Sequence, residues 1–238
     1  MEQNKTGKYF KYAIGEIILV VIGILIALSI NNWNERRKDG AYEQKILIEI
    51  KTSLERDLNR TKFLIEGRVT PKEESINRLL NTVALNRIDY DTTLLLRDLR
   101  NMGLTLSFSY DKGPYESLKS IGLEKIRNDS LRSALVRFYE VEMPLRIIFV
   151  DINKTLNETE RRDFFGDLVT YHLIKEIDTA TSVSTVERTD LKTLQTHPSF
   201  IKYIILEERV ALNYRRRLEH GVKQFERLIT HINSVLKP

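Results

Sequence analysis

One apolar run near the start of the chain sets the first limit on its fold. Within residues 14–30, only Glu16 and Ser29 carry polar side chains. With its immediate neighbours the run reaches about 20 residues, which span about 30 Å as a helix and match the thickness of a bilayer core. Its length and the absence of a small-residue cleavage motif argue against a signal peptide. We therefore predict a retained transmembrane helix over residues 13–33, preceded by a short N-terminal segment, residues 1–12.

Aromatic residues flank this predicted helix. Tyr9 and Tyr12 precede it and Trp33 closes it, at the positions where aromatic rings favour the headgroup zone. We interpret these three residues as interface anchors. Basic residues do not decide the orientation, because three precede the helix and three follow it: Lys5, Lys8, Lys11, Arg36, Arg37 and Lys38.

One face of the predicted membrane helix combines an acid with small residues. Steps of three and four place five residues on this face: Glu16, Val20, Gly23, Ala27 and Ile30. Gly23 and Ala27 form a small-xxx-small pair, which permits close helix approach. The pattern predicts a membrane-helix association face, with Glu16 bonded across helices or lining a polar path. The alternative for Glu16 is a position at interfacial depth, where nearby basic residues neutralise its charge.

The rest of the chain, residues 34–238, has helical periodicity and is predicted to form one α-helical bundle domain. Apolar residues step by three and four over residues 47–65. We therefore expect one long helix from the membrane to about Glu66, ended or kinked at Gly67. The Thr-Pro-Lys-Glu sequence at 70–73 has the pieces of a capping box and predicts a new helix start there.

Shorter segments follow before the pattern becomes regular again. We expect a short helix capped by Asp91 and stopped by Gly103, and then an extended loop over residues 104–112. Gly113 and the proline after it predict the start of another short helix, which Gly122 ends.

The second half of the chain is predicted to hold two long helices. One starts at the Asn128 cap, runs to about Glu176 and is kinked by Pro144, and a Ser- and Thr-rich loop over residues 177–190 follows. From Pro198 onward, eight apolar residues form an a/d seam of coiled-coil type: Ala211, Tyr214, Leu218, Val222, Phe225, Ile229, Ile232 and Leu236. The sequence therefore predicts an all-α fold, in which one N-terminal transmembrane helix continues into an elongated antiparallel helical bundle.

Patterns for catalysis and metal binding are missing. The chain has no cysteine, its four histidines lack ligand spacing, and no nucleotide-binding or nucleophile motif occurs. Neighbouring acids such as Glu140 and Glu142 diverge on a helix and do not share a proton. Since the net charge is only +5, we do not expect nucleic-acid binding. We predict no enzymatic activity, no metal and no cofactor.

Two features outside the membrane helix are candidate contact sites. The YDKGPYESL stretch contains Tyr110, Gly113, Pro114 and Tyr115 and is predicted as a partner loop. The alternative is a turn whose aromatic rings cap the bundle core. The arginine run 215–217 would suit an acidic partner, but consecutive residues spread around a helix, which favours a solvated face.

Two stretches carry a family resemblance. KYAIGEIILVVIGILIALSINNWNE, Lys11–Glu35, resembles the N-terminal signature of a family of uncharacterised bacterial single-pass membrane proteins, and YESLKSIGLEKIRNDSLR, Tyr115–Arg132, resembles its second recurrent segment. The resemblance covers the whole chain, with Ser29 where relatives typically carry glutamine. It implies an envelope setting rather than a chemistry. The basic N-termini of many relatives imply a cytoplasmic N-terminus and a bundle outside the bacterial inner membrane.

These features predict a membrane-anchored helical scaffold or assembly protein of the bacterial envelope that acts without catalysis, by oligomerisation or partner docking. The expected partners are the lipid bilayer and a second copy of the chain or another membrane protein. A sensor-like ligand-binding ectodomain is the first alternative, because a rigid stalk can pass shifts through a bilayer. The second is a cytosol-facing membrane anchor for an acidic partner, which requires the opposite topology.

Overall fold

A computed structural model describes residues 5–85, 92–153, 158 and 198–236, with the side chains of the first helix from Ile14 onward. All regular structure in these ranges is helical, which confirms the all-α prediction. The elements are α1 (Lys5–Leu64), η1 (Ile65–Val69), α2 (Thr70–Ala84), α3 (Thr92–Met102), α4 (Gly113–Ile121), η2 (Leu123–Lys125), α5 (Asp129–Arg137), η3 (Phe138–Glu142), helical residues 143–153, and α8 (Pro198–Val235).

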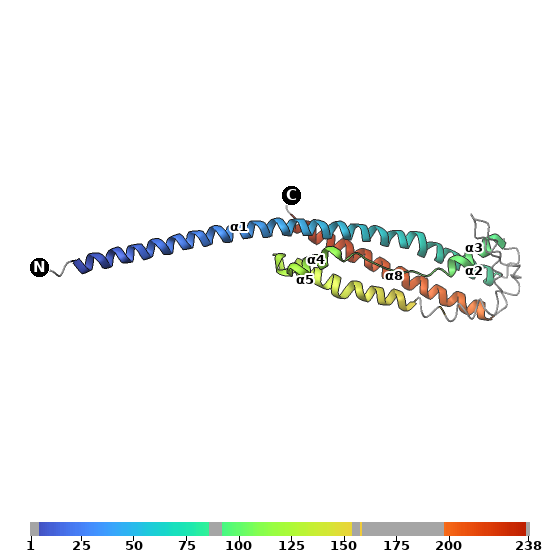
Figure 1. Ribbon diagram of the computed structural model, residues 1–238. Coiled ribbons are helices and arrows are strands. Elements are labelled where there is room, and N and C mark those ends of the chain that lie inside the picture. The colour runs from blue at the N-terminus through green and yellow to red at the C-terminus, as the bar shows by residue number, and fades with distance from the viewer. Residues whose placement is uncertain (1–4, 86–91, 154–157, 159–197, 237–238) are drawn as a thin grey trace, which may run out of the picture.

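The helices form the elongated antiparallel bundle that the sequence predicts. α1 projects well beyond the other helices with its N-terminal half and packs against α8 with its C-terminal half (Figure 1). α8 returns antiparallel to it, and Lys62 Nζ lies 2.9 Å from Glu226 Oε1. α2 packs on α3 and α8 at the far end, while α4 and α5 lie at the end where α1 leaves the bundle.

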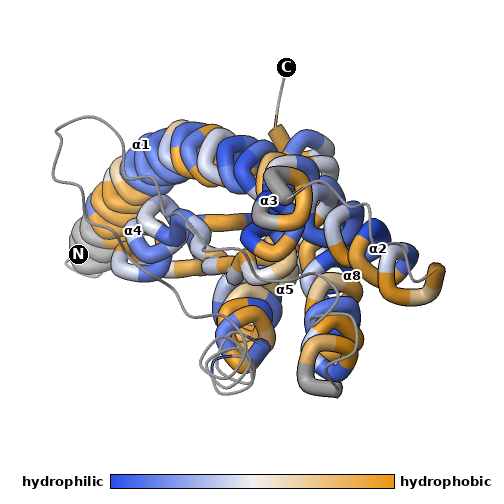
Figure 2. Tube along the Cα trace, turned by 90° about the vertical axis from the view of Figure 1, so that its right-hand side faces the viewer, coloured by the Kyte–Doolittle hydropathy of each residue, from blue (hydrophilic) through white to orange (hydrophobic). Residues whose placement is uncertain are grey.

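Two apolar clusters make up the core. The larger one joins α1, α4, α5, η3 and α8, and it includes Leu47, Ile50, Leu54, Leu118, Leu135, Phe138, Tyr214, Phe225 and Ile232. The smaller one joins α2, α3 and α8, and it includes Ile76, Leu79, Leu95, Leu99, Met102, Phe200, Tyr203, Ile204 and Ala211. All eight positions of the predicted α8 seam are buried or half-buried. Figure 2, along the bundle, shows that each long helix carries both polar and apolar residues, as amphipathic packing requires.

The expected end or kink at Gly67 takes the form of a π turn, and the predicted capping box at 70–73 is wrong. The chain stays helical from α1 through η1 into α2. Thr70 has helical angles, φ −58° and ψ −50°, and its hydroxyl donates to Ile65 O at 3.1 Å instead of capping a helix start. Pro71 explains the π turn, because a proline has no N–H for the carbonyl four residues earlier and collides with it.

The predicted kink at Pro144 is also a π turn. This turn, η3, ends at Glu142, two residues before the proline, and the helix continues over residues 143–153. η1 and η3 each begin six residues before a proline, Pro71 and Pro144 respectively. Both prolines are therefore accommodated by a local widening of the helix rather than by a break.

Several predicted helix ends are confirmed. Asn128 Oδ1 accepts a hydrogen bond from the backbone of α5 at 2.9 Å and caps that helix. Gly103 follows α3, and Gly122, at φ 127°, follows α4 in a backbone conformation that favours glycine. Residues 104–112 form no regular secondary structure, in line with the expected loop and without a strand. Three predicted features lie outside the described residues: the cap at Asp91, the helix end near Glu176 and the loop at 177–190.

Candidate functional site

The N-terminal half of α1 presents a continuous apolar surface. Every residue from 14 to 38 is exposed, and the most apolar 18-residue window of the helix has a mean hydropathy of 2.5 with none of it buried. Within the described ranges this is the one helix long and apolar enough to cross a membrane. Removing each large apolar side chain from water is worth about 1.5–3 kcal/mol, so burial of this surface in an apolar environment would be strongly favourable.

The predicted association face lies on this exposed segment. Its five residues, Glu16, Val20, Gly23, Ala27 and Ile30, are all exposed. A Cβ added to Gly23 would meet nothing within 4 Å. Glu16, Ile17, Val20 and Val21 line a hollow of about 320 Å³ on the helix surface. The face is therefore open to a second helix along its whole length.

The predicted interface anchors are partly described. Trp33 is 63% exposed at the end of the apolar segment, and the Arg37 guanidinium carbon lies 5.9 Å from the centre of its ring. This places an indole and a cation together where the helix turns polar, an arrangement suited to a headgroup layer. Tyr9 and Tyr12 lie in α1, but their side chains are outside the described part.

The predicted partner loop is tied to α1 by its backbone. Asp111 N donates to Asp57 Oδ2 at 2.7 Å, and Ser53 Oγ donates to Asp111 O at 3.1 Å. Burial raises the pKa of Asp57, and the hydrogen bond from Asp111 opposes that rise. Gly113 is exposed and Pro114 is half-buried at the start of α4.

The tyrosines of this loop point into the bundle. Tyr115 is 1% exposed and stacks on Tyr139, with ring centres 4.4 Å apart and planes 9° apart. Tyr110 is half-buried, and its hydroxyl donates to Tyr139 O at 3.4 Å. Burial raises the pKa of Tyr139 well above its ordinary value. This geometry is that of a turn whose rings cap the core, and it leaves Gly113 as the most accessible of the four predicted residues.

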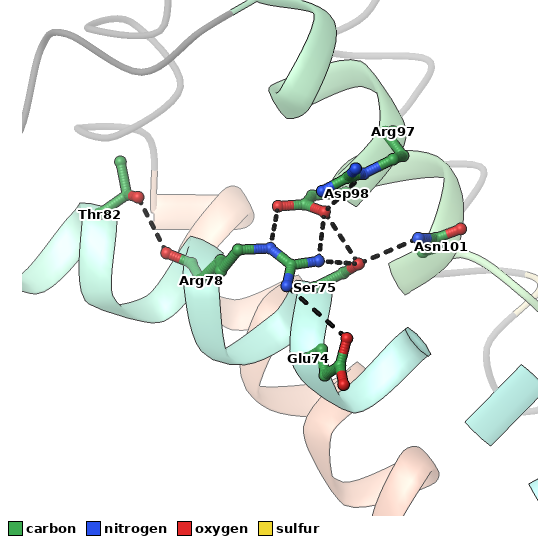
Figure 3. A network of polar contacts seen from close by, with 7 residues as sticks. All are labelled: Glu74, Ser75, Arg78, Thr82, Arg97, Asp98 and Asn101. Atoms are coloured by element: carbon green, nitrogen blue, oxygen red, sulfur yellow. Dashed lines mark hydrogen bonds and ion pairs between the residues drawn. The ribbon is translucent and has the colours of Figure 1, made fainter. Parts of the chain in front are cut away.

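A buried carboxylate, Asp98, joins α3 to α2 (Figure 3). Arg78 donates to both carboxylate oxygens, through Nε and Nη2, at 2.8 Å each. Ser75 Oγ donates to Asp98 Oδ1 at 2.9 Å, and Asn101 Nδ2 donates to Ser75 Oγ at 3.2 Å. Bidentate charge-assisted bonds fix orientation as well as distance, so this network holds α3 in one position on α2.

Two ion pairs fasten α2 to α8. Lys72 pairs with Glu207, both buried, and its ammonium also donates to two backbone carbonyls at the C-terminal end of α3. Glu73 accepts from Arg215 Nε at 2.8 Å, and this hydrogen bond raises the pKa of the Arg215 guanidinium. Since buried charges are costly without partners, these pairs favour one specific alignment of the two helices.

The arginine run spreads over different surroundings. Arg215 pairs with Glu73, Arg217 places its guanidinium carbon 4.0 Å from the centre of the Phe149 ring, and Arg216 is exposed. The three residues therefore do not form one flat basic patch, in line with the spread expected around a helix.

Arg146 is a buried cation between residues 143–153 and α8. It is 4% exposed, and it donates to the backbone carbonyl of Arg217 and the side-chain oxygen of Gln224. Gly221 permits this approach, because a Cβ there would lie 2.7 Å from Arg146 Nη1. Burial lowers the pKa of Arg146 to about 10, so the group still carries its charge at neutral pH.

The sequence contains a signal for these buried charges that a search for apolar periodicity passes over. Lys72 shares a helix face with Ile76 and Leu79 through steps of four and three, and all three side chains are buried. Asp98, Arg146 and Glu207 occupy the same kind of position on their helices. A charged residue in a core register is a marker for a polar contact between helices.

Two hollows on the described bundle surface are large enough for a small molecule, and neither contains grouped metal ligands. One of about 520 Å³ lies between α2 and α8 and includes Ile76, Ile205 and Leu212 in its lining. Another, of about 290 Å³, lies between α5, η3 and α8 beside Ser133 and Gln224. In the part of the chain that the structure describes, no three His, Cys, Asp or Glu side chains are placed to hold a metal ion.

The fold and these surfaces define an all-α protein in which one helix is long and apolar enough to span a membrane. A family of unknown function, DUF6090, matches the chain over residues 16–190, and the chain belongs to this family. This match confirms the resemblance to an uncharacterised family, whereas the bacterial single-pass nature stays a prediction. No curated protein and no solved structure matches the chain.

Proposed function

We propose that this protein is a membrane-anchored helical scaffold or assembly protein of the bacterial envelope, which acts by oligomerisation or partner docking rather than catalysis. The continuity of α1 carries the proposal. One helix joins the exposed apolar residues 14–33 to core residues such as Leu47 and Ile50. A bundle built on such a rod is held at a fixed height above the membrane that the rod enters.

The proposed location is the inner membrane, with a cytoplasmic N-terminus and the bundle outside. The absence of cysteine allows a direct test, in which Ser234→Cys introduces one thiol on the exposed side of α8. A maleimide that cannot cross the inner membrane should label this variant in cells whose outer membrane has been permeabilised. Ser53→Cys is the matched control, because Ser53 is buried and its thiol should react only after denaturation. Labelling of Ser234→Cys only after lysis would contradict the proposed orientation.

Self-association through the Gly23 face is the second part of the proposal. Gly23→Leu fills the open surface beside Ala27 and should reduce crosslinking of the full chain in native membranes. Ser29→Leu is the control, since it places the same leucine side chain about 120° away from Gly23 around the helix axis. Equal crosslinking of wild type and Gly23→Leu would exclude this face as the association surface.

A ligand-binding ectodomain is the second candidate, favoured by the hollow of about 520 Å³ between α2 and α8. Its volume lies within the range of small-molecule sites. Native mass spectrometry of the purified full chain tests it, with Leu212→Arg as the variant that blocks the hollow. A small molecule that is retained by wild type and lost by the variant would favour the sensor over the scaffold.

A cytosol-facing anchor for an acidic partner has less support. It requires the arginine run to be available, but Arg215 and Arg217 already contact Glu73 and Phe149. Arg216 and Arg217 are exposed, but Arg217 packs on the Phe149 ring, which leaves Arg216 as the one residue of the three without an ion pair, hydrogen bond or ring contact among the described residues. The Ser234→Cys experiment decides between this topology and the proposed one.

A further inference from the structure

The bundle ends toward the membrane segment in a helical hairpin. α4 runs toward the end where α1 leaves the bundle, η2 turns the chain, and α5 runs back (Figure 1). Gly122 makes the reversal with φ 127°, which other residues adopt rarely. We call residues 121–127 the α4–α5 tip.

Three contacts fix the α4–α5 tip on α1 close to Trp33. Arg127 Nη2 donates to Arg36 O at 2.6 Å, and Lys125 Nζ lies 2.8 Å from Asp39 Oδ1. The backbone N–H of Arg127 also donates to Glu43 at 2.8 Å. Arg36 and Asp39 follow Trp33 by three and six residues, which is about 4.5 Å and about 9 Å along the helix axis. Glu43 follows Trp33 by ten residues, or about 15 Å. The tip is therefore held on the part of α1 that begins next to the position where Trp33 would meet the interface.

The α4–α5 tip exposes an apolar residue. Ile121, the last residue of α4, is 54% exposed although its neighbours Leu118 and Leu123 pack into the core. Gly122 N–H donates to Leu118 O at 3.0 Å and closes α4 directly after Ile121. An exposed isoleucine at the end of the bundle that faces the apolar segment is suited to enter the boundary between headgroups and acyl chains.

Cations lie on α1 next to the residues that hold the α4–α5 tip. Arg36 and Lys38 are exposed, and neither side chain has an ion-pair partner among the described residues. The nearby acids Asp39 and Glu43 are already engaged by Lys125 and Arg127. Arg37 adds a third cation over Trp33, while Glu35 and Glu124 remain as acids at this end. The excess is thus a local positive charge, of the kind that contacts individual phosphates rather than attracting from a distance.

We propose that the α4–α5 tip is a second membrane contact, resting on phospholipid headgroups of the same leaflet interface as Trp33. Ile121 enters the interface, and Arg36 and Lys38 meet headgroup phosphates. The proposal rests on the membrane anchoring proposed above and adds the surface by which the bundle touches the bilayer. Two contacts, the helix and the tip, restrict how far the bundle can tilt, which a single helix does not.

Single-cysteine variants of the full chain in vesicles test this proposal. Ile121→Cys carries a fluorescent label at the tip, and Ile148→Cys carries it at a control site of matched exposure, 51%, on the helix of residues 143–153. Lipids brominated near the headgroup quench a label that touches the interface. Trp33, the only tryptophan, reports insertion of α1 by its own quenching in the same samples.

We expect Trp33 to be quenched. We also expect the label at position 121 to be quenched at least about threefold more than the label at position 148, because only position 121 reaches the interface. In vesicles with anionic lipid, Arg36→Gln with Lys38→Gln should reduce the quenching at 121 to about half, whereas Arg216→Gln on the exposed side of α8 should not. Quenched Trp33 with equal quenching at 121 and 148 would overturn the second contact and leave the anchor intact. Unquenched Trp33 would overturn the anchor itself, and an unchanged signal in the double Arg36 and Lys38 variant would remove the phosphate contacts.

Discussion

Gly221→Ala is expected to destabilise the bundle, against the usual effect of this change in a helix. Replacing glycine by alanine inside a helix ordinarily stabilises by about 1 kcal/mol, because alanine loses less backbone entropy. At Gly221 the new Cβ would lie 2.7 Å from Nη1 and 2.8 Å from Cζ of Arg146. Arg146 is 4% exposed and is held by Arg217 and Gln224, so a shift of its guanidinium disturbs both hydrogen bonds.

The magnitude follows from what Arg146 must give up. Loss of one hydrogen bond from a charged donor costs about 1.5–3 kcal/mol, and overpacking costs about 1–3 kcal/mol. After subtracting the helix gain of about 1 kcal/mol, we expect the free energy of unfolding to fall by about 1.5–5 kcal/mol. Urea denaturation of the full chain in detergent micelles, followed by far-UV circular dichroism, measures this change.

Gly67→Ala is the matched control, since its Cβ would lie at an ordinary 3.5 Å from the Phe63 ring. This variant should be as stable as wild type or gain up to about 1 kcal/mol. In the Arg146→Met background, Gly221→Ala should lose most of its effect, because the obstructing guanidinium is gone. A Gly221→Ala protein as stable as wild type would show that Arg146 does not pack as described.

Three further predictions concern the buried polar groups. Asp98→Asn should lower the free energy of unfolding by about 2–3 kcal/mol, which is less than the loss of a fully buried ion pair costs, because Arg78 is partly exposed. Glu74→Gln, at the edge of the same network, should change the free energy of unfolding by under about 0.5 kcal/mol. The urea midpoint of each variant measures both changes. Burial raises the pKa of Asp57, so this carboxyl stabilises the fold at a pH below the ordinary carboxyl pKa, and the stabilisation is lost as the pH rises through the folded-state pKa. Asp57→Asn should therefore be more stable than wild type at neutral pH and no more stable in acid. Thermal melts at both pH values measure this difference, and a gain in stability that does not depend on pH would contradict it. The Tyr139 hydroxyl is buried without a hydrogen-bond partner among the described residues, so Tyr139→Phe should change stability by only about 0–1 kcal/mol in either direction, whereas Tyr139→Ala should cost about 3–5 kcal/mol through lost stacking and a cavity.

The helical framework could be predicted because each segment carries its own local signal. Asn128, Gly103 and Gly122 mark helix ends through the capping and turn chemistry of single residues, and the α8 seam follows from its three-and-four spacing. Those signals do not depend on what packs against the segment. The apolar run of α1 was equally plain, since its length alone sets it apart from a bundle helix.

The error at Thr70 arose because the same residues satisfy two rules. A hydroxyl, a proline and a glutamate in this order are typical of a helix start. The same residues also occur where a continuous helix accommodates a proline through a π turn. What decides between them is tertiary: Glu73 binds Arg215 on α8, and Lys72 is buried beside it. A pairing between residues more than a hundred positions apart cannot be read from the local sequence. Asp98 and Arg146 likewise pair with residues on other elements, so their core register indicates that a polar contact exists but not which residue makes it.

The two π turns mark where the long helices tolerate a change in chain length. Within an ordinary α-helix, one added or deleted residue rotates everything that follows by about 100° around the helix axis, whereas a π turn holds one extra residue in a single widened turn. Deleting a single residue within Ile65–Val69 is therefore expected to leave Lys72 and Glu73 facing α8, because the turn can close to α-helical geometry. The same deletion in α1 between the π turn and the core residues Ile50 and Leu54 would turn Lys72 and Glu73 away from their partners.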